Sequence, residues 1–390
     1  MTSFDPDVFL KRQGIRRLLK ALDAKQGTAR FVGGAVRDLL LKVPHEDLDL
    51  ATTLPPDEVI RRLEAKGIKA VPTGIDHGTI TAVSSGTVVE VTTLRSDVST
   101  DGRRATVAFT DDWKLDAGRR DFTINALYAD PYSGELFDYF GGLADLDSRT
   151  VRFIGEPLAR IAEDHLRILR YFRFHARYGH GEPDAHALEA CTARANDLMA
   201  LSRERIADEM LKLLALDDPT QTVRLMLQQG IMAPVLPEID NASRLESLVT
   251  AERAAGAEPN ALRRLASLLP PDPQAVERIA ARLKLSNKAK KRLGSAADQS
   301  LGTGSRALAY RLGTEGAVDR LLLAGRADDA ASIKSWKPPR LPIGGSDVMA
   351  RGVRQGPDVA KTLRRIEDAW EAAGFPKGKL FDRLVDDILA

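Results

Sequence analysis

The sequence has little cysteine and no long apolar run. Cys191 is the single cysteine among 390 residues, which excludes an intramolecular disulfide and a cysteine-based structural zinc site. It predicts a reducing compartment, the cytoplasm, and no disulfide-linked partner. No stretch of about 18 apolar residues occurs, so we expect no membrane-spanning helix. The N-terminal segment carries acidic residues early and lacks the apolar core of a secretory signal.

An excess of charge of one sign is also missing. The 57 basic and 55 acidic side chains leave a net charge of +2, which excludes a histone-like polycation. Any binding to nucleic acid must therefore come from local clusters of charge. None of the six histidines is followed by aspartate, so the His-Asp signature of metal-dependent phosphohydrolases is absent.

Strand-like and helical patterns divide the chain into two parts. The length predicts about two to four domains, and 43% hydrophobic residues suffice for a packed core. Strands are expected at 29–32, 45–51, 78–84, 87–94 and 106–109, with helices at 7–22, 36–41 and 56–66. From about residue 157 onward, Arg- and Leu-rich helical repeats broken by Gly and Pro dominate. The sequence therefore predicts an α+β fold: a head of about 140 residues followed by an all-α body in several pieces.

Two glycines stand between the first predicted strand and the next helix. Gly33 and Gly34 would let a triphosphate approach the backbone, and Arg37 lies one turn into the helix, where it could neutralise a phosphate. The pattern lacks the Lys-Ser/Thr ending of a P-loop. An ordinary tight turn is the alternative interpretation.

Acidic residues on two predicted strands suggest a metal site. Asp47 and Asp49 are two positions apart, so on a strand they face the same side, while Leu48 and Leu50 face the core. Such a pair suits two Mg²⁺ ions about 4 Å apart; a solvated turn is the alternative. Glu90, in an otherwise apolar strand, is either a third acidic group of the site or an edge-strand glutamate facing water.

A polar segment, 95–118, precedes the motif Arg-Arg-Asp-Phe-Thr-Ile-Asn at 119–125. The segment is expected to be a mobile loop over a site, because it is rich in charge and glycine. Arg120 could bind a triphosphate. Asp121 and Asn125, at helical i and i+4 spacing, could cap a turn or meet a ribose hydroxyl.

The segment 163–174 is predicted to be one helix. Asp164 and Arg167 lie one turn apart along the border of its buried face, and together they could present an acceptor and a donor to the edge of a base. An ordinary helix salt bridge is the alternative. Arg170 and Arg173 fall off this strip in an ideal helix. A second basic stretch, 278–292, has seven Lys or Arg and no acid; if functional, it would contact phosphates.

Taken together and in this order, these segments resemble the class II tRNA nucleotidyltransferases, the bacterial-type CCA-adding enzymes of the polymerase β superfamily. The resemblance covers the whole chain. The motifs that carry it are FVGGAVRDLL and EDLDLATT (within 31–53), VVEVTTLR (88–95), RRDFTINAL (119–127), EDHLRILRYFRF (163–174), LSRERIADEMLKLL (201–214) and GGSDVMARGVRQGPDVAKTL (344–363).

The resemblance implies both an architecture and a set of site residues. It implies a polymerase β-type head with a small mixed sheet (1–140), a helical neck with the nucleotide-selecting helix (141–215), and an RNA-binding body (216–300) and tail (301–390). It implies that Asp47 and Asp49 bind two catalytic Mg²⁺ ions, and from its place in an apolar strand we predict Glu90 as a further catalytic acid. The nucleotide-binding residues that it implies, together with those suggested above, are Gly33, Gly34, Arg37, Arg120, Asp121, Arg170 and Arg173, with Asp164 and Arg167 as the protein template.

The implied reaction is template-independent addition of C, C and A to tRNA 3′ ends from CTP and ATP, with release of pyrophosphate and with the tRNA held by its acceptor and TΨC arms. The segment 95–118 looks complete, which favours full CCA addition over CC addition. A poly(A) polymerase is the alternative. Such enzymes carry a Gly-basic-basic-Phe run soon after the motif that corresponds to RRDFTINAL (119–127), and this run is missing here. An inactive RNA-binding protein with the same fold is a third interpretation.

Overall fold

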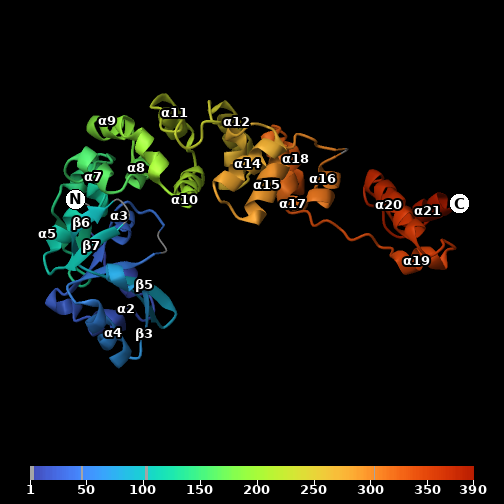
Figure 1. The fold of residues 1–390 in the computed structure, drawn as a ribbon. Coiled ribbons are helices and arrows are strands. Elements are labelled where there is room, and N and C mark those ends of the chain that lie inside the picture. Colours follow the sequence, from blue (N-terminus) through green and yellow to red (C-terminus); the bar gives the residue numbers. More distant parts are fainter. Residues whose placement is uncertain (1–3, 45–46, 102–103, 303) are drawn as a thin grey trace. The chain divides into compact units, whose positions relative to one another are not determined.

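The computed structural model describes residues 4–44, 47–101, 104–302 and 304–390 (Figure 1). It forms two compact units. The first, here called the head-and-neck unit, comprises Met1–Ser202 and Gln228–Val235. The second, the helical unit, comprises Arg203–Leu227 and Leu236–Ala390. No helix within the described residues is both long and apolar enough to cross a membrane.

A seven-stranded mixed sheet is the centre of the head. Its strands, in chain order, are β1 (Ala29–Val32), β2 (Asp49–Thr52), β3 (Lys69–Gly74), β4 (Thr79–Ser84), β5 (Thr87–Thr93), β8 (Leu127–Ala129) and β9 (Leu136–Asp138). The order in the sheet is β3-β4-β5-β2-β1-β8-β9, in which β2 and β5 are parallel and the other neighbours antiparallel. The prediction of an α+β head with a small mixed sheet is confirmed.

The helices near the sheet agree only in part with the predicted ones. They are α1 (Asp7–Leu10), α2 (Ile15–Ala21), η1 (Ala24–Gln26), α3 (Gly34–Leu40), α4 (Pro56–Ala65) and η2 (Ile75–His77). The single helix expected at 7–22 is wrong, because Gly14, with φ +80°, separates α1 from α2. A side chain at Gly14 would bring its Cβ within 2.4 Å of the Ser84 carbonyl oxygen, so the chain turns here against β4.

The segment 95–118 contains regular structure, so the expectation of a loop is wrong, whereas the strand expected at 106–109 is confirmed as part of a longer strand. Strands β6 (Arg95–Asp101) and β7 (Arg104–Phe109) pair antiparallel as a sheet of their own, and α5 (Trp113–Gly118) follows. Asp112 caps α5 by accepting hydrogen bonds from the N–H groups of Lys114 and Leu115. Alternating Thr, Val and Ala in β7 favour a strand in spite of the surrounding charge.

The part of the head-and-neck unit that follows α5 is mainly helical. Its helices are η3 (Thr123–Asn125), α6 (Gly142–Asp147), α7 (Pro157–Glu163), α8 (Leu166–Tyr178), α9 (Ala185–Ala193) and η4 (Ala195–Ala200). Phe122 packs on Phe153 and Phe174, with ring centroids 5.0 and 5.1 Å apart, and so joins the end of the head to α8. Cys191 is buried in α9.

The helical unit contains only helices within its described residues. They are α10 (Arg203–Leu214), α11 (Thr220–Gln228), α12 (Ser243–Ala254), α13 (Ala261–Leu268), α14 (Pro273–Arg282), α15 (Asn287–Ala297), α16 (Ser305–Leu312), α17 (Thr314–Leu323), α18 (Ala327–Ile333), α19 (Gly345–Ala350), α20 (Pro357–Ala372) and α21 (Lys379–Leu389), of which α11 ends at the unit boundary. The predicted all-α region after the head is confirmed.

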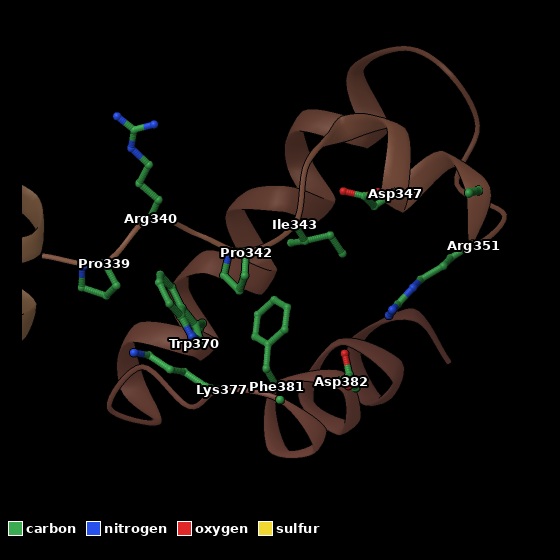
Figure 2. A pocket seen from close by; sticks show the side chains of 12 residues that line it. Pro339, Arg340, Pro342, Ile343, Asp347, Arg351, Trp370, Lys377, Phe381 and Asp382 are labelled. Carbon is green, nitrogen blue, oxygen red and sulfur yellow. The ribbon is translucent and has the colours of Figure 1, made fainter.

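The interior of the helical unit contains a cluster of buried ion pairs and, near the C-terminus, an apolar core. Glu252 forms buried ion pairs with Arg263 and Arg264 at 2.6 and 2.9 Å, and Asp319 pairs with Arg263 at 2.8 Å. Near the C-terminus, the ring of Phe381 lies below Pro342 and beside Trp370 at a cavity of about 670 Å³ (Figure 2). Trp370 and Phe381 are 1% and 6% exposed, so the wall of this cavity is part of a packed core.

Candidate active site

Residues from four parts of the head-and-neck unit line one cavity of about 390 Å³. The parts are the β1–α3 turn, the start of β2, the segment 119–125 and the α7–α8 region. The lining residues are Gly33, Gly34, Arg37, Asp49, Arg119, Arg120, Asp121, Asn125, Asp164, Arg167, Arg170 and Phe174. The structure thus brings together most of the predicted site residues; Asp47, Glu90 and Arg173 are not part of the lining.

The glycine turn keeps the cavity open at its base. Gly33 has φ +61°, a conformation that favours glycine, and a Cβ there would lie 3.4 Å from the Arg120 Nη1 atom. A Cβ at Gly34 would lie 3.6 Å from the Arg37 Nη2 atom. The sequence therefore forms a tight turn, and the missing side chains leave space between the backbone and two arginines.

The acidic residues gather at the junction of β2 and β5. Leu48 and Leu50 are 2% and 0% exposed, which confirms the predicted alternation about Asp49. The parallel register pairs Asp49 with Glu90, and Glu90 is exposed on a strand inside the sheet rather than on an edge. Asp47 is exposed just before β2. The expected strand 45–51 begins at Asp49, and residues 45 and 46 lie outside the described part of the chain.

The charge of this junction favours a bound cation. Burial raises the pKa of the Asp49 carboxyl, and so do the negative charges of Glu90 and Asp47, while Arg120 and Arg37 lower it; together these effects bring the pKa to about 6. A cation beside these carboxylates would relieve this cost, so the residues present fit a divalent metal ion. In the described residues no three His, Cys, Asp or Glu side chains are gathered closely enough to hold a metal. One or two carboxylates together with substrate phosphates suffice for Mg²⁺.

Arg37 is fixed by protein contacts. It is 6% exposed and donates hydrogen bonds to Asp38 Oδ1 at 2.7 Å and to the Tyr178 hydroxyl at 2.6 Å, as well as to the Asn125 side-chain oxygen. Its guanidinium lies 4.1 Å from the centre of the Tyr178 ring. Helix α3 of the head is thereby joined to α8 of the neck beneath the cavity.

Asp116 holds the two arginines of the 119–125 segment, and sequence reasoning missed it. Its side chain is 1% exposed and pairs with Arg119 at 2.8 Å and with Arg120 at 3.2 Å, while Tyr128 donates its hydroxyl hydrogen to it. Burial would raise the pKa of Asp116, but the charges of Arg120 and Arg119 and the Tyr128 hydrogen bond outweigh it and lower the pKa to about 2. The i,i+3 and i,i+4 spacing to two arginines was the available signal.

Asp121 accepts hydrogen bonds from three residues. Its Oδ1 accepts from the Phe122 N–H and from the Asn125 amide, both at 2.9 Å, which supports the turn-capping interpretation. Its Oδ2 pairs with Arg170 at 2.6 Å. Burial raises the pKa of Asp121, yet the Arg170 charge and these hydrogen bonds lower it to about 2.

The predicted continuous helix at 163–174 is wrong. Asp164 has extended backbone angles between α7 and α8, and its Oδ1 accepts a hydrogen bond from the Leu166 N–H at 3.1 Å. Arg167, in the first turn of α8, pairs with Glu163 at 2.6 Å and donates to the carbonyl oxygens of Arg160 and Arg119. Asp164 and Arg167 both line the cavity, one from an extended residue and one from a helix.

The first turns of α8 also provide Arg170 and Phe174 to the cavity. Arg167, Arg170 and Phe174 are spaced i, i+3 and i+7, so they share one face of the helix. The expectation that Arg170 lies away from the strip of Asp164 and Arg167 is wrong. Asp164 is not part of α8, and Arg170 faces the cavity from the same side of the helix as Arg167. Arg173 lies outside the lining, with its guanidinium 4.7 Å from the centre of the Phe174 ring.

The lining has five arginines and three aspartates, which makes the cavity suited to a polyanion. Arg119 and Phe174 were not predicted from the sequence. Phe174 could have been predicted from its spacing of seven residues from Arg167, which places both on one face of a helix. Arg119 could have been predicted because it precedes Arg120 in the chain.

Comparison with known proteins gives consistent matches along the chain. Residues 29–152 match the family described as the Poly A polymerase head domain, and residues 182–243 match the probable RNA and SrmB-binding site of polymerase A. The mitochondrial CCA tRNA nucleotidyltransferase 1 of Mus musculus is 35% identical over 384 residues, covering 93% of this chain and 87% of the relative. The CCA-adding enzyme of Staphylococcus epidermidis is 38% identical over 211 residues, 54% of this chain and 51% of the relative.

A solved structure matches almost the whole chain. The Bacillus stearothermophilus CCA-adding enzyme in complex with CTP superposes with a TM-score of 0.75 at 27% identity, covering 96% of this chain and 98% of the other.

Proposed function

The chain belongs to the family of CCA-adding tRNA nucleotidyltransferases, and we propose from this premise that it adds C, C and A to the 3′ ends of tRNA, using CTP and ATP and releasing pyrophosphate. The observation that carries the proposal is the convergence of the family's motifs on one arginine-rich cavity in a chain that is 35% identical to such an enzyme over 93% of its length.

The family uses a divalent metal, and the finer assignment is two Mg²⁺ ions held by Asp47 and Asp49, with Glu90 beside them. Bound there, the metal would activate the attacking 3′-hydroxyl and stabilise the leaving pyrophosphate. The support from this chain is the raised pKa of Asp49, which reflects burial and the neighbouring negative charges.

The triphosphate would lie against the glycine turn and the arginines. Gly33 and Gly34 leave the backbone accessible, and Arg120 stands 3.4 Å from the position of a Gly33 Cβ. Arg37 and Arg170 face the same cavity, each already held by a carboxylate, so their guanidinium groups are in place before the nucleotide arrives. Asp121 acts in this proposal by holding Arg170, and Arg173 supports the Phe174 ring from outside the lining.

Asp164 and Arg167 would select the base. Among the described residues, N–H groups of Arg167 donate to Glu163, Arg160 and Arg119, and its other N–H groups would donate to acceptor atoms on the edge of the base. The Asp164 carboxylate would accept from the amino group of cytosine or adenine, whereas guanine and uracil place the wrong groups on this edge. A fixed guanidinium and a carboxylate thus replace a nucleic-acid template.

The decisive experiment incubates the protein with Mg²⁺, CTP, ATP and a tRNA that lacks its 3′ CCA. The expected product is extended by three nucleotides, and the Asp47→Ala/Asp49→Ala variant is the inactive control. A long A tail would instead establish a poly(A) polymerase, and no extension with both nucleotides would leave an RNA-binding protein.

The division of the chain into domains and the compartment are also proposals. The division into head (1–140), neck (141–215), body (216–300) and tail (301–390) is still a prediction. The cytoplasm stays our proposal for the compartment, on the ground of the single cysteine; relatives named mitochondrial share this family.

A further inference from the structure

Arg160 contacts two parts of the candidate active site, although it is not part of the cavity lining. It lies in α7, and its side chain is 11% exposed. Its Nη1 donates a hydrogen bond to Glu163 Oε1 at 2.7 Å. Its Nη2 donates to the carbonyl oxygens of Arg119 and Arg120 at 2.5 and 2.7 Å. One guanidinium therefore joins the end of α7 to the backbone of the segment that provides Arg119 and Arg120 to the cavity.

The main chain of Arg160 belongs to the same arrangement. Helix α7 ends at Glu163, so the carbonyl groups of its last turn have no partner within the helix. The carbonyl oxygen of Arg160 accepts a hydrogen bond from Arg167 Nη1 at 2.9 Å. Arg167 also donates to Glu163 Oε2 at 2.6 Å and to the Arg119 carbonyl oxygen at 3.3 Å. Arg160 and Arg167 thus share two acceptors, the Glu163 carboxylate and the Arg119 carbonyl group.

The orientation of the Glu163 carboxylate depends on Arg160. The Glu163 side chain is 26% exposed, so without its bond to Arg160 it could turn toward solvent. Among the acceptors described above, Arg167 would then keep only carbonyl oxygens, which bind a guanidinium less strongly than a carboxylate does. The backbone at 119–120 would lose its link to α7 at the same time. Two parts of the cavity would therefore become mobile relative to each other.

We propose that Arg160 is a positioning residue for base selection, which holds the Arg167 guanidinium at a fixed place relative to the backbone at 119–120. The inference rests on the proposed function, in which Arg167 contacts the base and Arg120 the triphosphate. Arginine donates from two nitrogens in a fixed fork, whereas lysine has a single nitrogen on a flexible stem. Lysine at this position keeps the charge but cannot reproduce both sets of contacts.

The test compares the full-length wild type with Arg160→Lys and with Arg62→Lys as a matched control. Arg62 of α4 is also partly buried and pairs with Glu58 and Asp23, but it lies outside the cavity lining. The kcat/KM values for CTP and UTP are measured on tRNA lacking CCA, and those for ATP and GTP on tRNA ending in CC. We expect the ratios CTP/UTP and ATP/GTP to fall about tenfold in Arg160→Lys, with tRNA affinity within about twofold of the wild type. The control should keep both ratios.

A ratio of two kcat/KM values from one protein sample does not depend on the fraction of folded protein. The measurement therefore remains valid if Arg160→Lys is less stable than the wild type. Arg160→Gln, which removes the charge as well, should lower both ratios by at least as much. Combining Arg160→Lys with Arg167→Ala tests the route of the effect. If Arg160 acts through Arg167, the double variant should differ from Arg167→Ala by less than about twofold in both ratios.

Unchanged ratios in Arg160→Lys and Arg160→Gln would overturn the proposal. An equal loss of kcat/KM for all four nucleotides would also overturn it, because it would indicate a purely structural role. A further tenfold fall of the ratios in the Arg167→Ala background would show that Arg160 does not act through Arg167, with the same consequence. Failure of the wild type to extend tRNA refutes the proposed function instead, and this is seen without any variant.

Discussion

Replacing Asp49 with asparagine should stabilise the metal-free protein at pH 8, although it removes a residue proposed to be essential. Burial, and then the charges of Glu90 and Asp47, raise the pKa of Asp49 from 3.8 to about 6. A carboxyl whose pKa is higher in the folded state binds its proton more tightly there, so its contribution to stability is present below pH 3.8 and is lost as the pH rises to about 6. Above that pH the wild type retains a buried charge that asparagine does not have.

The size of the gain follows from the two pKa values. The interval between 3.8 and about 6 corresponds to about 3 kcal/mol at pH 8, and the same linkage gives about 1 kcal/mol at pH 4.5. Hydrogen exchange at amides of β1 and β2, read by mass spectrometry with EDTA present, measures the free energy of opening of the head separately from the helical unit. Asp147→Asn, an exposed aspartate of the same unit, is the control and should change stability by less than about 0.5 kcal/mol.

A variant that is equally stable or less stable than the wild type at pH 8 would refute the reasoning. It would mean that Asp49 forms favourable interactions in the metal-free protein that outweigh burial and the neighbouring acids. A gain that is the same at pH 4.5 and pH 8 would also count against it, because the stabilisation would then have no connection with ionisation.

Three further predictions concern the site and the helical unit. Asp47→Ala should abolish nucleotide addition in a primer-extension assay while tRNA affinity stays within about twofold, and retained extension would remove Asp47 from the metal site. Arg167→Ala should relax the choice among the four nucleoside triphosphates more than it weakens tRNA binding, as competition assays would show; unchanged selectivity would exclude the template role. Glu252→Gln should cost about 3–5 kcal/mol in urea unfolding, because it removes the carboxylate that pairs with the buried Arg264 and leaves the buried Arg263 with Asp319 alone, whereas the exposed Glu315→Gln should cost less than about 1 kcal/mol.

The fold was predictable wherever a pattern of burial repeats along the chain. The strand at 29–32 and the helix beginning at Pro56 have the expected bounds, because apolar alternation and an N-terminal proline are local signals. Of the hairpin at 95–109, only the second strand was expected, at 106–109; the first strand was missed because it pairs only within the hairpin, outside the main sheet, and carries polar residues. The break at Gly14 depends on a close contact with Ser84, which no local pattern reveals.

The sequence predicted most of the residues that line the site. It did not predict the contacts that hold their side chains in place. Gly33, Asp49 and Arg120 each belong to a segment with its own chemical signal, and the structure places all three at one cavity. The support for these residues comes from tertiary partners. Arg37 is bound by Asn125 and Tyr178, which lie 88 and 141 positions away along the chain. Such contacts follow from the folded sheet and neck, not from spacing.

The interruption at Asp164 bears on the proposed template role of Asp164 and Arg167. A continuous helix would place Asp164 and Arg167 in a flexible i,i+3 pair that water could satisfy, worth about 0.2–0.5 kcal/mol. In the structure the helix begins after Asp164, and Arg167 is held by Glu163 and by two backbone carbonyl oxygens. The entropy of ordering the guanidinium is therefore lost during folding, so under the proposed function a base with the wrong edge would meet a fixed donor that cannot rearrange to suit it.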